Sequence, residues 1–170
     1  MAQQLTHSDS TFRKKEYPII LVCENLSSPA NLGSLLRLSD AFGIERILFS
    51  NENINFKSSR LNRTARGTQN FVPFEDSVNI FEYIQNLKKS DFNIFGLEIT
   101  QTSMALHDIP IVKNKKTVLI IGNERNGISE TILKLCDAIV HINMYGKNSS
   151  MNVAQASAIA LYAITQKYAL

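Results

Sequence analysis

The sequence predicts an α/β fold, a single domain built on a mainly parallel, Rossmann-like sheet. Short apolar runs, typical of strands covered on both faces, alternate with segments whose apolar residues have helical spacing. The chain has 170 residues, of which 44% are hydrophobic, which suits one domain with a substantial core. No repeat or linker rich in proline and glycine divides it, so we expect a polar tail over residues 1–17 and one domain over residues 18–170.

Five apolar runs predict the strands. The first begins directly after the polar tail and consists of six consecutive apolar residues, as expected for a strand with helices on both faces. Helical patterns lie between most of the runs, which favours parallel pairing. The runs cover residues 18–23, 47–49, 94–97, 118–121 and 138–142.

Four segments predict helices. The first starts at Pro29, because Ser27 and Ser28 can cap it and proline suits a first turn, and it ends before Gly43. The last is rich in alanine and lets another backbone approach closely, inside the fold or across a dimer, although an ordinary core helix explains it equally well. The other two helices are expected over residues 78–89 and 129–136, and the last over residues 153–167.

Composition excludes several classes of protein. No apolar stretch reaches the roughly 18 to 20 residues that cross a bilayer, so no membrane association is expected. The first residues lack a secretory signal, and we expect a cytoplasmic location. The net charge of +3 is compatible with a polyanionic partner but does not establish one. Cys23 and Cys136 lie in separate apolar segments, which predicts buried thiols rather than a disulfide or a zinc site.

Common catalytic patterns are poorly represented. None of the three histidines has a partner at the spacing of a metal site or a catalytic triad, so no metal is expected. Gly122 and Gly127 have the spacing of a P-loop, but Ile128 and Ser129 follow where lysine and a hydroxyl residue are required, which argues against an ATPase. The glycine pattern of dinucleotide-binding folds is also missing. The histidines are His7, His107 and His141.

Three polar segments follow predicted strands, at the edge where open α/β sheets bind ligands. They cover residues 25–37, 120–127 and 142–152. Each also has a structural explanation. The glycines of the second segment permit close contact with a ligand or an ordinary turn, and the third segment can cap the last helix.

The first polar segment places Arg37 one helical turn after Gly33, away from the apolar stripe of its helix. A phosphate could approach the helix there. The alternative is a surface arginine paired with Asp40.

Together, in this order and spacing, the segments resemble the three motifs of the SpoU/TrmH family of SPOUT-class RNA methyltransferases. Residues 25–43 resemble the first motif, residues 121–128 the second and residues 142–154 the third. Met151 departs from the leucine that is more common in the family, and a flexible apolar residue should serve there.

The resemblance implies methyl transfer from S-adenosylmethionine to a ribose 2′-hydroxyl of tRNA or rRNA. It also implies a deep C-terminal trefoil knot and a homodimer that completes each active site. Many rRNA-directed members carry a separate N-terminal RNA-binding domain, and none is expected here, which favours tRNA. By motif position, the cofactor pocket should be lined by Gly122, Ile142 and Met151, with Leu97, Glu98, Asn123 and Met144 close by.

The resemblance also assigns roles to polar residues. Arg37 matches the catalytic arginine, as a base or, since a guanidinium stays charged, as the group that orients a phosphate and stabilises the developing alkoxide. Asn31 and Asn152 should support the target ribose and the knot loops. Glu124 should orient the arginine or the RNA, and Ser150 should bond near the methyl donor.

A basic stretch over residues 60–68 resembles the family segment after the second strand. Its arginines are candidates for phosphate contacts, and a solvated basic loop is the alternative. They are Arg60, Arg63 and Arg66.

Two other functions compete with methyl transfer. The first is a non-catalytic RNA-binding protein that retains the knotted fold. The second is an enzyme acting on a free nucleotide. Measuring cofactor binding distinguishes the non-catalytic protein from a methyltransferase. Competition between RNA and free nucleosides distinguishes an enzyme that acts on free nucleotides from one that acts on RNA.

Overall fold

The computed structural model describes residues 13–51 and 54–169. Seven strands form one sheet in the order β3-β2-β1-β6-β4-β7-β5, and every pair is parallel. The prediction of a single α/β domain with a parallel sheet is therefore confirmed. The strands are β1 (Tyr17–Cys23), β2 (Ile44–Phe49), β3 (Phe74–Glu75), β4 (Phe92–Leu97), β5 (Met104–Ala105), β6 (Lys116–Ile121) and β7 (Ala138–His141).

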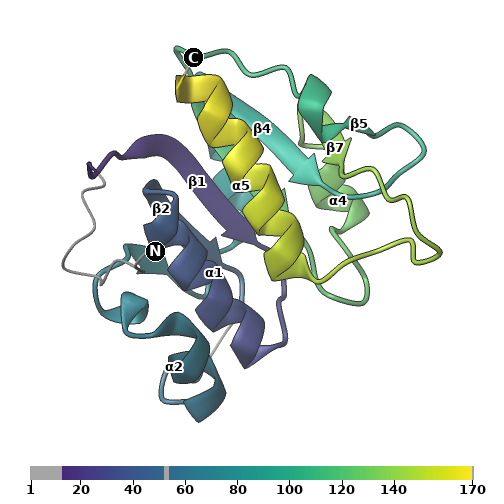
Figure 1. Ribbon diagram of the computed structural model, residues 1–170. Helices are drawn as coiled ribbons and strands as arrows, with labels where there is room; N and C mark the ends of the chain where they lie inside the picture. Colours follow the sequence, from purple (N-terminus) through teal and green to yellow (C-terminus); the bar gives the residue numbers. More distant parts are fainter. Residues whose placement is uncertain (1–12, 52–53, 170) are drawn as a thin grey trace, which may run out of the picture.

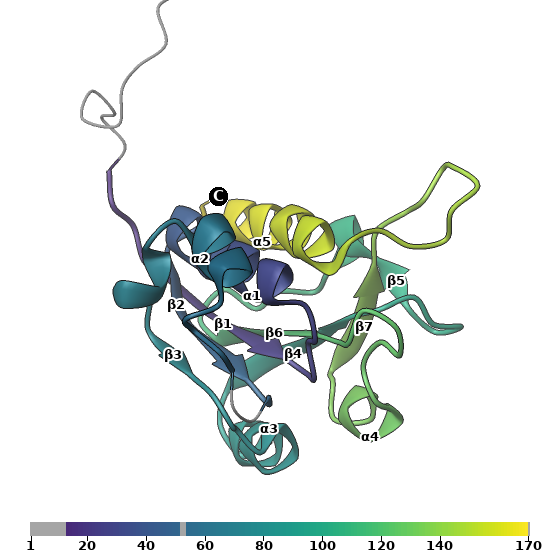
Figure 2. The same cartoon turned by 90° about the horizontal axis from the view of Figure 1, so that it is seen from below.

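Helices cover both faces of the sheet. In Figure 2, α1, α2 and α5 lie on one side and α3 and α4 on the other, while Figure 1 shows α1 and α5 side by side. Two short 3₁₀ helices lie in the connections, η2 between α2 and β3 and η3 between β5 and β6. The helices are α1 (Pro29–Ala41), α2 (Ser59–Ala65), η2 (Thr68–Asn70), α3 (Ile80–Lys88), η3 (Leu106–Asp108), α4 (Glu130–Leu133) and α5 (Val153–Ala169).

Helix α1 shows how local sequence sets its bounds. Ser28 is the N-cap, and its side chain accepts a hydrogen bond from the backbone N–H of Asn31. Gly43 ends the helix with φ of +56°, and an added Cβ would meet the carbonyl oxygen of Lys15. The predicted cap, first turn and end of this helix are all confirmed.

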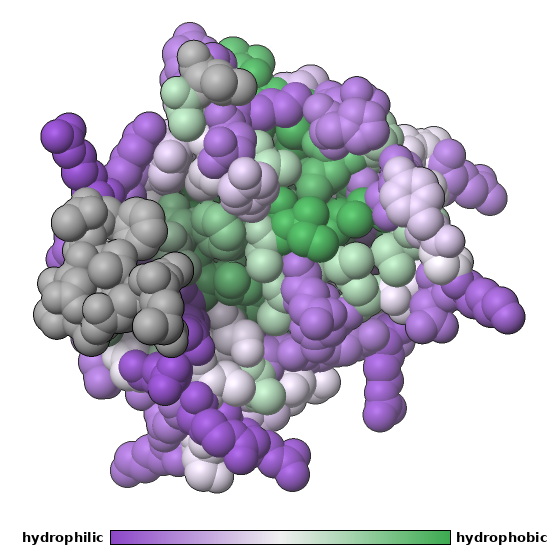
Figure 3. Space-filling model, viewed as in Figure 1, coloured by the Kyte–Doolittle hydropathy of each residue, from purple (hydrophilic) through white to green (hydrophobic). Residues whose placement is uncertain are grey.

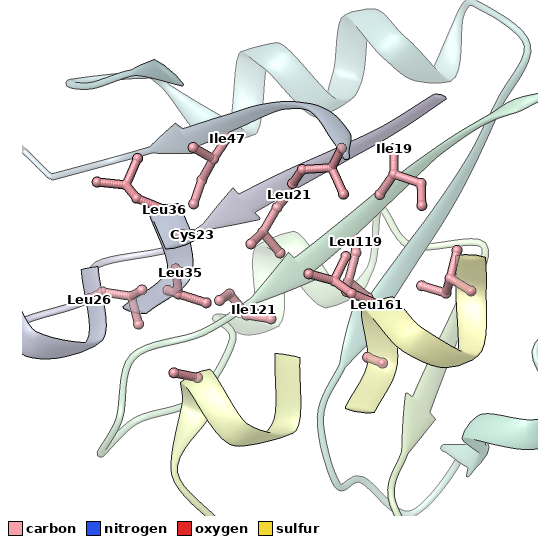
Figure 4. Close-up of a cluster of buried hydrophobic side chains, with 14 of the residues drawn as sticks. Ile19, Leu21, Cys23, Leu26, Leu35, Leu36, Ile47, Leu119, Ile121 and Leu161 are labelled. Carbon is pink, nitrogen blue, oxygen red and sulfur yellow. The ribbon is translucent and has the colours of Figure 1, made fainter. Parts of the chain in front are cut away.

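Alternation along the strands divides the core in two. In β1, Ile19, Leu21 and Cys23 face the layer of α1 and α5, whereas Ile20 and Val22 face α3. The first cluster is drawn in Figure 4. Both faces of the sheet are buried, which explains why its strands are continuously apolar.

The two cysteines are free. Cys23 is fully buried, and burial raises the pKa of its thiol. Cys136 is partly exposed, so the expectation of a buried thiol is confirmed only for Cys23. Desolvation raises the pKa of Cys136 to about 12, with Asp137 adding to the effect.

Elements outside the predicted set are short. Strands β3 and β5 have two residues each, and α2 buries only Leu61 and Ala65. Within residues 13–51 and 54–169, no helix is long and apolar enough to cross a membrane.

Candidate functional site

The three polar segments meet at the carboxyl edge of the sheet. Strands β1, β6, β4 and β7 are neighbours, so the residues after their last positions come together. The Asn123 amide, after β6, donates to the carbonyl oxygen of Asn25, after β1. Glu24 accepts from the backbone N–H and the hydroxyl of Ser129, at 2.8 and 2.6 Å, which anchors the start of α4.

A chain of hydrogen bonds joins residues from all three segments. The Asn152 amide nitrogen donates to Asn31 Oδ1 at 3.0 Å, and the Asn31 amide nitrogen donates to Glu124 Oε1 at 2.9 Å. Asn152 Oδ1 also accepts from the backbone N–H of Ala154 at 2.9 Å, so this side chain caps α5 as well. The start of α5 is thus fixed to α1 through two asparagines.

Glu124 is the last member of this chain. Its carboxylate accepts from the backbone N–H groups of Ser27 and Ser28, at 3.0 and 3.1 Å, and from the Ser27 hydroxyl at 3.0 Å. Burial alone would raise the pKa of Glu124, but the hydrogen bonds from Ser27, Asn31 and Ser28 outweigh it and lower the pKa to about 2. The carboxylate is therefore ionised and committed to the loop before α1.

Glu124 does not contact Arg37, one of the two groups that it was expected to orient, within one chain. In the part of the chain that the structure describes, no hydrogen bond or ion pair joins the two side chains.

A pocket of about 330 Å³ opens beside this chain of hydrogen bonds. All seven residues expected to bind the cofactor line it, together with Glu124, Ser150 and Asn152. Apolar side chains form much of its wall, and polar groups lie around them. The seven are Leu97, Glu98, Gly122, Asn123, Ile142, Met144 and Met151.

Two glycines shape the wall of the pocket. Backbone hydrogen bonds in both directions between Asn123 and Gly127, at 3.0 and 2.9 Å, close a tight turn. Gly127 has φ of +66°, and an added Cβ would meet the Glu98 carboxylate, which accepts from the Ile128 N–H at 3.1 Å. An added Cβ at Gly122 would strike the backbone of Gly127 and Ile128. A side chain at Gly122 would therefore collide with the protein's own turn instead of entering the pocket.

Gly33 lies against α2 and is not open to a phosphate. An added Cβ there would meet the Thr64 hydroxyl and the Leu61 carbonyl oxygen of α2. The spot on α1 expected to admit a phosphate is instead covered by a close contact between α1 and α2.

Arg37 is exposed on α1 and does not line the pocket. Among the described residues, no carboxylate lies within ion-pair distance of its guanidinium, so the alternative pairing with Asp40 is not formed. The arginine is free to meet a group from outside this chain.

The basic stretch forms most of α2. Arg60 and Arg63 lie on this helix, Arg66 follows it directly, and all three are exposed. They lie outside the pocket.

Sequence reasoning missed several pocket residues. His141 lines the pocket, with Nδ1 at 3.0 Å from the Ser103 hydroxyl and Nε2 at 3.1 Å from Asn143 Oδ1. Ile99 and Ala156 line it too. Their positions in the sequence could have indicated them, because His141 ends β7 and Ile99 lies just beyond β4, at the carboxyl edge of the sheet.

The geometry suits a small organic ligand with an apolar part and a polar part. A volume of 330 Å³ lies within the usual range of ligand pockets, roughly 300 to 1,000 Å³. In residues 13–51 and 54–169, no cluster of three or more His, Cys, Asp or Glu side chains could hold a metal ion.

Comparisons with known proteins find RNA methyltransferases. The family model described as the SpoU rRNA Methylase family matches residues 18–162. An uncharacterized tRNA/rRNA methyltransferase of Borreliella burgdorferi is 30% identical over 159 residues, which cover 92% of this chain and 68% of that protein. The 23S rRNA (guanosine(2553)-2′-O)-methyltransferase of Bacillus subtilis is 27% identical over 84% of this chain and 56% of its own length.

An uncharacterized tRNA/rRNA methyltransferase of Synechocystis is 30% identical over 86% of this chain, which spans only 38% of that relative. Among solved structures, the TrmH/SpoU tRNA modifying enzyme of A. aeolicus is 25% identical with a TM-score of 0.78, over 91% of this chain and 77% of that one. An AdoMet-bound rRNA methyltransferase from Sinorhizobium meliloti, 22% identical over 94% of this chain and 59% of that one, has the same fold with a TM-score of 0.78.

Proposed function

The chain belongs to the SpoU rRNA methylase family, and on that premise we propose that it transfers a methyl group from S-adenosylmethionine to the 2′-hydroxyl of a ribose in RNA. The observation that carries this proposal is the pocket at the carboxyl edge, lined by all seven expected cofactor residues. Relatives are named for methylation of tRNA and rRNA, so the proposed substrate is an RNA of either kind.

The residues of the pocket fit S-adenosylmethionine. Leu97, Ile142 and Met151 offer an apolar wall for the adenine ring, while the Glu98 carboxylate and the Asn123 amide offer polar partners. A protein of the same fold, the S. meliloti rRNA methyltransferase, binds AdoMet. When bound, this cofactor supplies an electrophilic methyl group on a sulfonium sulfur.

The protein's own contribution is to position an oxygen nucleophile. Asn31 and Asn152 position the target ribose, and Ser150 forms a hydrogen bond near the methyl donor. Arg37 orients the neighbouring phosphate through its planar fork and stabilises the negative charge that develops on the ribose oxygen, whose proton is released to water. Glu124 acts indirectly, since its carboxylate holds Ser27, Ser28 and Asn31 in place.

A homodimer completes each active site in this proposal. Within one chain Arg37 lies outside the pocket, so the arginine that serves a pocket comes from the second copy. Helix α5 supports this arrangement, because its start lines the pocket while Ile159 and Tyr162, 43% and 59% exposed, lie on its outer face. Apolar side chains are gathered on the face of the molecule that carries α5 (Figure 3).

We also propose that the C-terminal segment is knotted. Residues 142–152 run from the end of β7 to α1, where a hydrogen bond between the side chains of Asn152 and Asn31 holds the end of this segment. Single-molecule stretching tests the knot, since a knotted chain pulled from both ends stays shorter than its open contour length. A full contour length would contradict it.

Calorimetric titration of the protein with S-adenosylmethionine tests the proposed function first. We expect saturable binding, and its absence would show that the pocket does not bind this cofactor. Incubation of the loaded protein with RNA then separates methyl transfer from the alternative, an RNA-binding protein without activity.

A further inference from the structure

The net positive charge of the chain is concentrated in one segment. Residues 54–74 contain four basic residues and no aspartate or glutamate, giving +4 against +3 for the whole chain, so the remaining residues together carry −1. All four basic side chains are exposed, and none is within ion-pair distance of a carboxylate of the described chain. They are Lys57, Arg60, Arg63 and Arg66.

This segment folds as one compact unit. Arg66 and Gly67 have φ of 52° and 91°, which turns the chain back on itself after α2. The Thr68 hydroxyl then donates to the Ala65 carbonyl oxygen at 2.7 Å, and the Gln69 amide donates to Asn62 Oδ1 at 2.8 Å. Helix η2 is therefore held against the helix that carries two of the arginines.

Phe71 follows η2 directly and is 64% exposed. The other two phenylalanines of the segment pack together, since the rings of Phe56 and Phe74 are 4.6 Å apart between centroids. No aromatic partner of Phe71 is found in the described part of the chain. The segment thus carries one exposed phenylalanine without an aromatic partner together with four exposed cations, all of them unpaired within the described chain.

The unit lies beside the proposed catalytic arginine. Helix α2 packs on α1 at Gly33, one turn before Arg37. Both helices lie on the same face of the sheet (Figures 1 and 2).

We propose that Phe71 stacks on an unpaired base of the RNA substrate while the four cations contact the phosphates around it. Aromatic faces among basic residues are typical of single-strand binding, because any base can stack and the backbone charge is neutralised alongside. In a duplex the base faces are covered by their neighbours, so the recognised segment is single-stranded. The inference rests on the proposed function for its partner, RNA, and adds the state of the RNA beside the target.

Binding without cofactor tests this stacking. The probe is a single-stranded RNA of about 12 nucleotides containing 2-aminopurine, a length within the usual site size of single-strand binders. The affinity of Phe71→Ala should fall at least about tenfold, with loss of the change in 2-aminopurine fluorescence on binding, while Phe71→Trp should restore both. Phe81→Ala is the matched control, because Phe81 is an exposed phenylalanine on α3, across the sheet.

The cations are tested through salt dependence. Arg63→Gln should weaken binding and lower the slope of log affinity against log salt by about 0.7, as expected for one lost phosphate contact on a single strand. Lys134→Gln is the control, since Lys134 lies on the far helix layer in an ion pair with Glu130.

Two results would overturn the inference. One is equal affinity of wild type and Phe71→Ala for the single strand, and the other is wild-type preference for a blunt duplex of the same sequence. Loss of methyl transfer together with intact, Phe71-dependent binding would contradict the proposed function alone. Methyl transfer with Phe71-independent binding would contradict this inference alone.

Discussion

At the scale of single residues, Glu124 and Arg37 illustrate two different uses of charge. Glu124 accepts hydrogen bonds from Ser27, Ser28 and Asn31, so its charge stabilises the loop before α1. Arg37 has no such partner in the described chain and stays available to an external phosphate. The sequence placed both in the motifs, but it could not separate the structural role from the external one.

Replacing Glu124 by glutamine should remove a pH-dependent part of the stability. The folded protein holds the pKa of Glu124 at about 2, below its usual 4.5, so the charge stabilises the fold above pH 4.5 and the effect disappears as pH falls towards 2. Because the side chain is largely exposed, we expect a difference of only about 1 kcal/mol at neutral pH. Urea unfolding of wild type and Glu124→Gln across pH checks this. A constant difference from pH 7 to 3, or one shared by Glu82→Gln, would contradict it.

Arg37→Lys should keep the charge and lose the planar fork. Methyl transfer should fall by roughly 10², or about 2.7 kcal/mol of transition-state stabilisation, while cofactor affinity changes little. Arg37→Ala should be at least as slow. Single-turnover rates with saturating RNA provide the measurement, and a rate near wild type for Arg37→Ala would show that the family role does not apply to this chain.

Ala156→Leu should narrow the pocket directly. Ala156 lines it from the first turn of α5, whereas a change at Gly122 would strain the turn at Gly127 and confuse binding with folding. We expect affinity for S-adenosylmethionine to fall at least about tenfold, or 1.4 kcal/mol. Calorimetry with Gln155→Leu, an exposed neighbour, as control gives the comparison. Equal affinity of the two variants would place the cofactor elsewhere.

At the scale of elements, the periodicity of apolar residues predicted the helices and strands that are long or fully buried. The five apolar runs became β1, β2, β4, β6 and β7, and the four expected helices became α1, α3, α4 and α5. Helix α2 was missed because it buries only Leu61 and Ala65, too few positions for a stripe. Its contact with Gly33 was missed for the same reason, although it fixes the basic segment on α1.

Charge placed on the outer face of α5 should separate the proposed dimer. Wild type should scatter light as about twice 19.1 kDa, and Ile159→Glu should approach the monomer mass, because a buried, unpaired carboxylate opposes association. Methyl transfer should fall in parallel if the partner supplies Arg37. Phe81→Glu is a matched control, since Phe81 and Ile159 are 42% and 43% exposed. A monomeric wild type with full activity would contradict both the dimer and the shared site.

At the scale of the whole molecule, the sequence predicted the edge where the site lies but not how its parts are joined. Parallel strands bring their carboxyl ends together, so the polar segments after β1, β6 and β7 were expected to meet. The bonds from Asn152 to Asn31 and from Asn31 to Glu124 span 121 and 93 residues, and no local pattern encodes such pairs. The knot was expected only from the family resemblance, because folds without knots are the rule.

Methylation of a ribose hydroxyl in RNA is the activity that we propose for this chain. The most direct measurement is incubation with methyl-labelled S-adenosylmethionine and separate tRNA and rRNA pools, followed by digestion and identification of the labelled nucleotide. We expect label on a single 2′-O-methylated nucleotide, formed at least about 10² times more slowly by Arg37→Ala. Label on a base, or no label despite saturable binding of both cofactor and RNA, would contradict it.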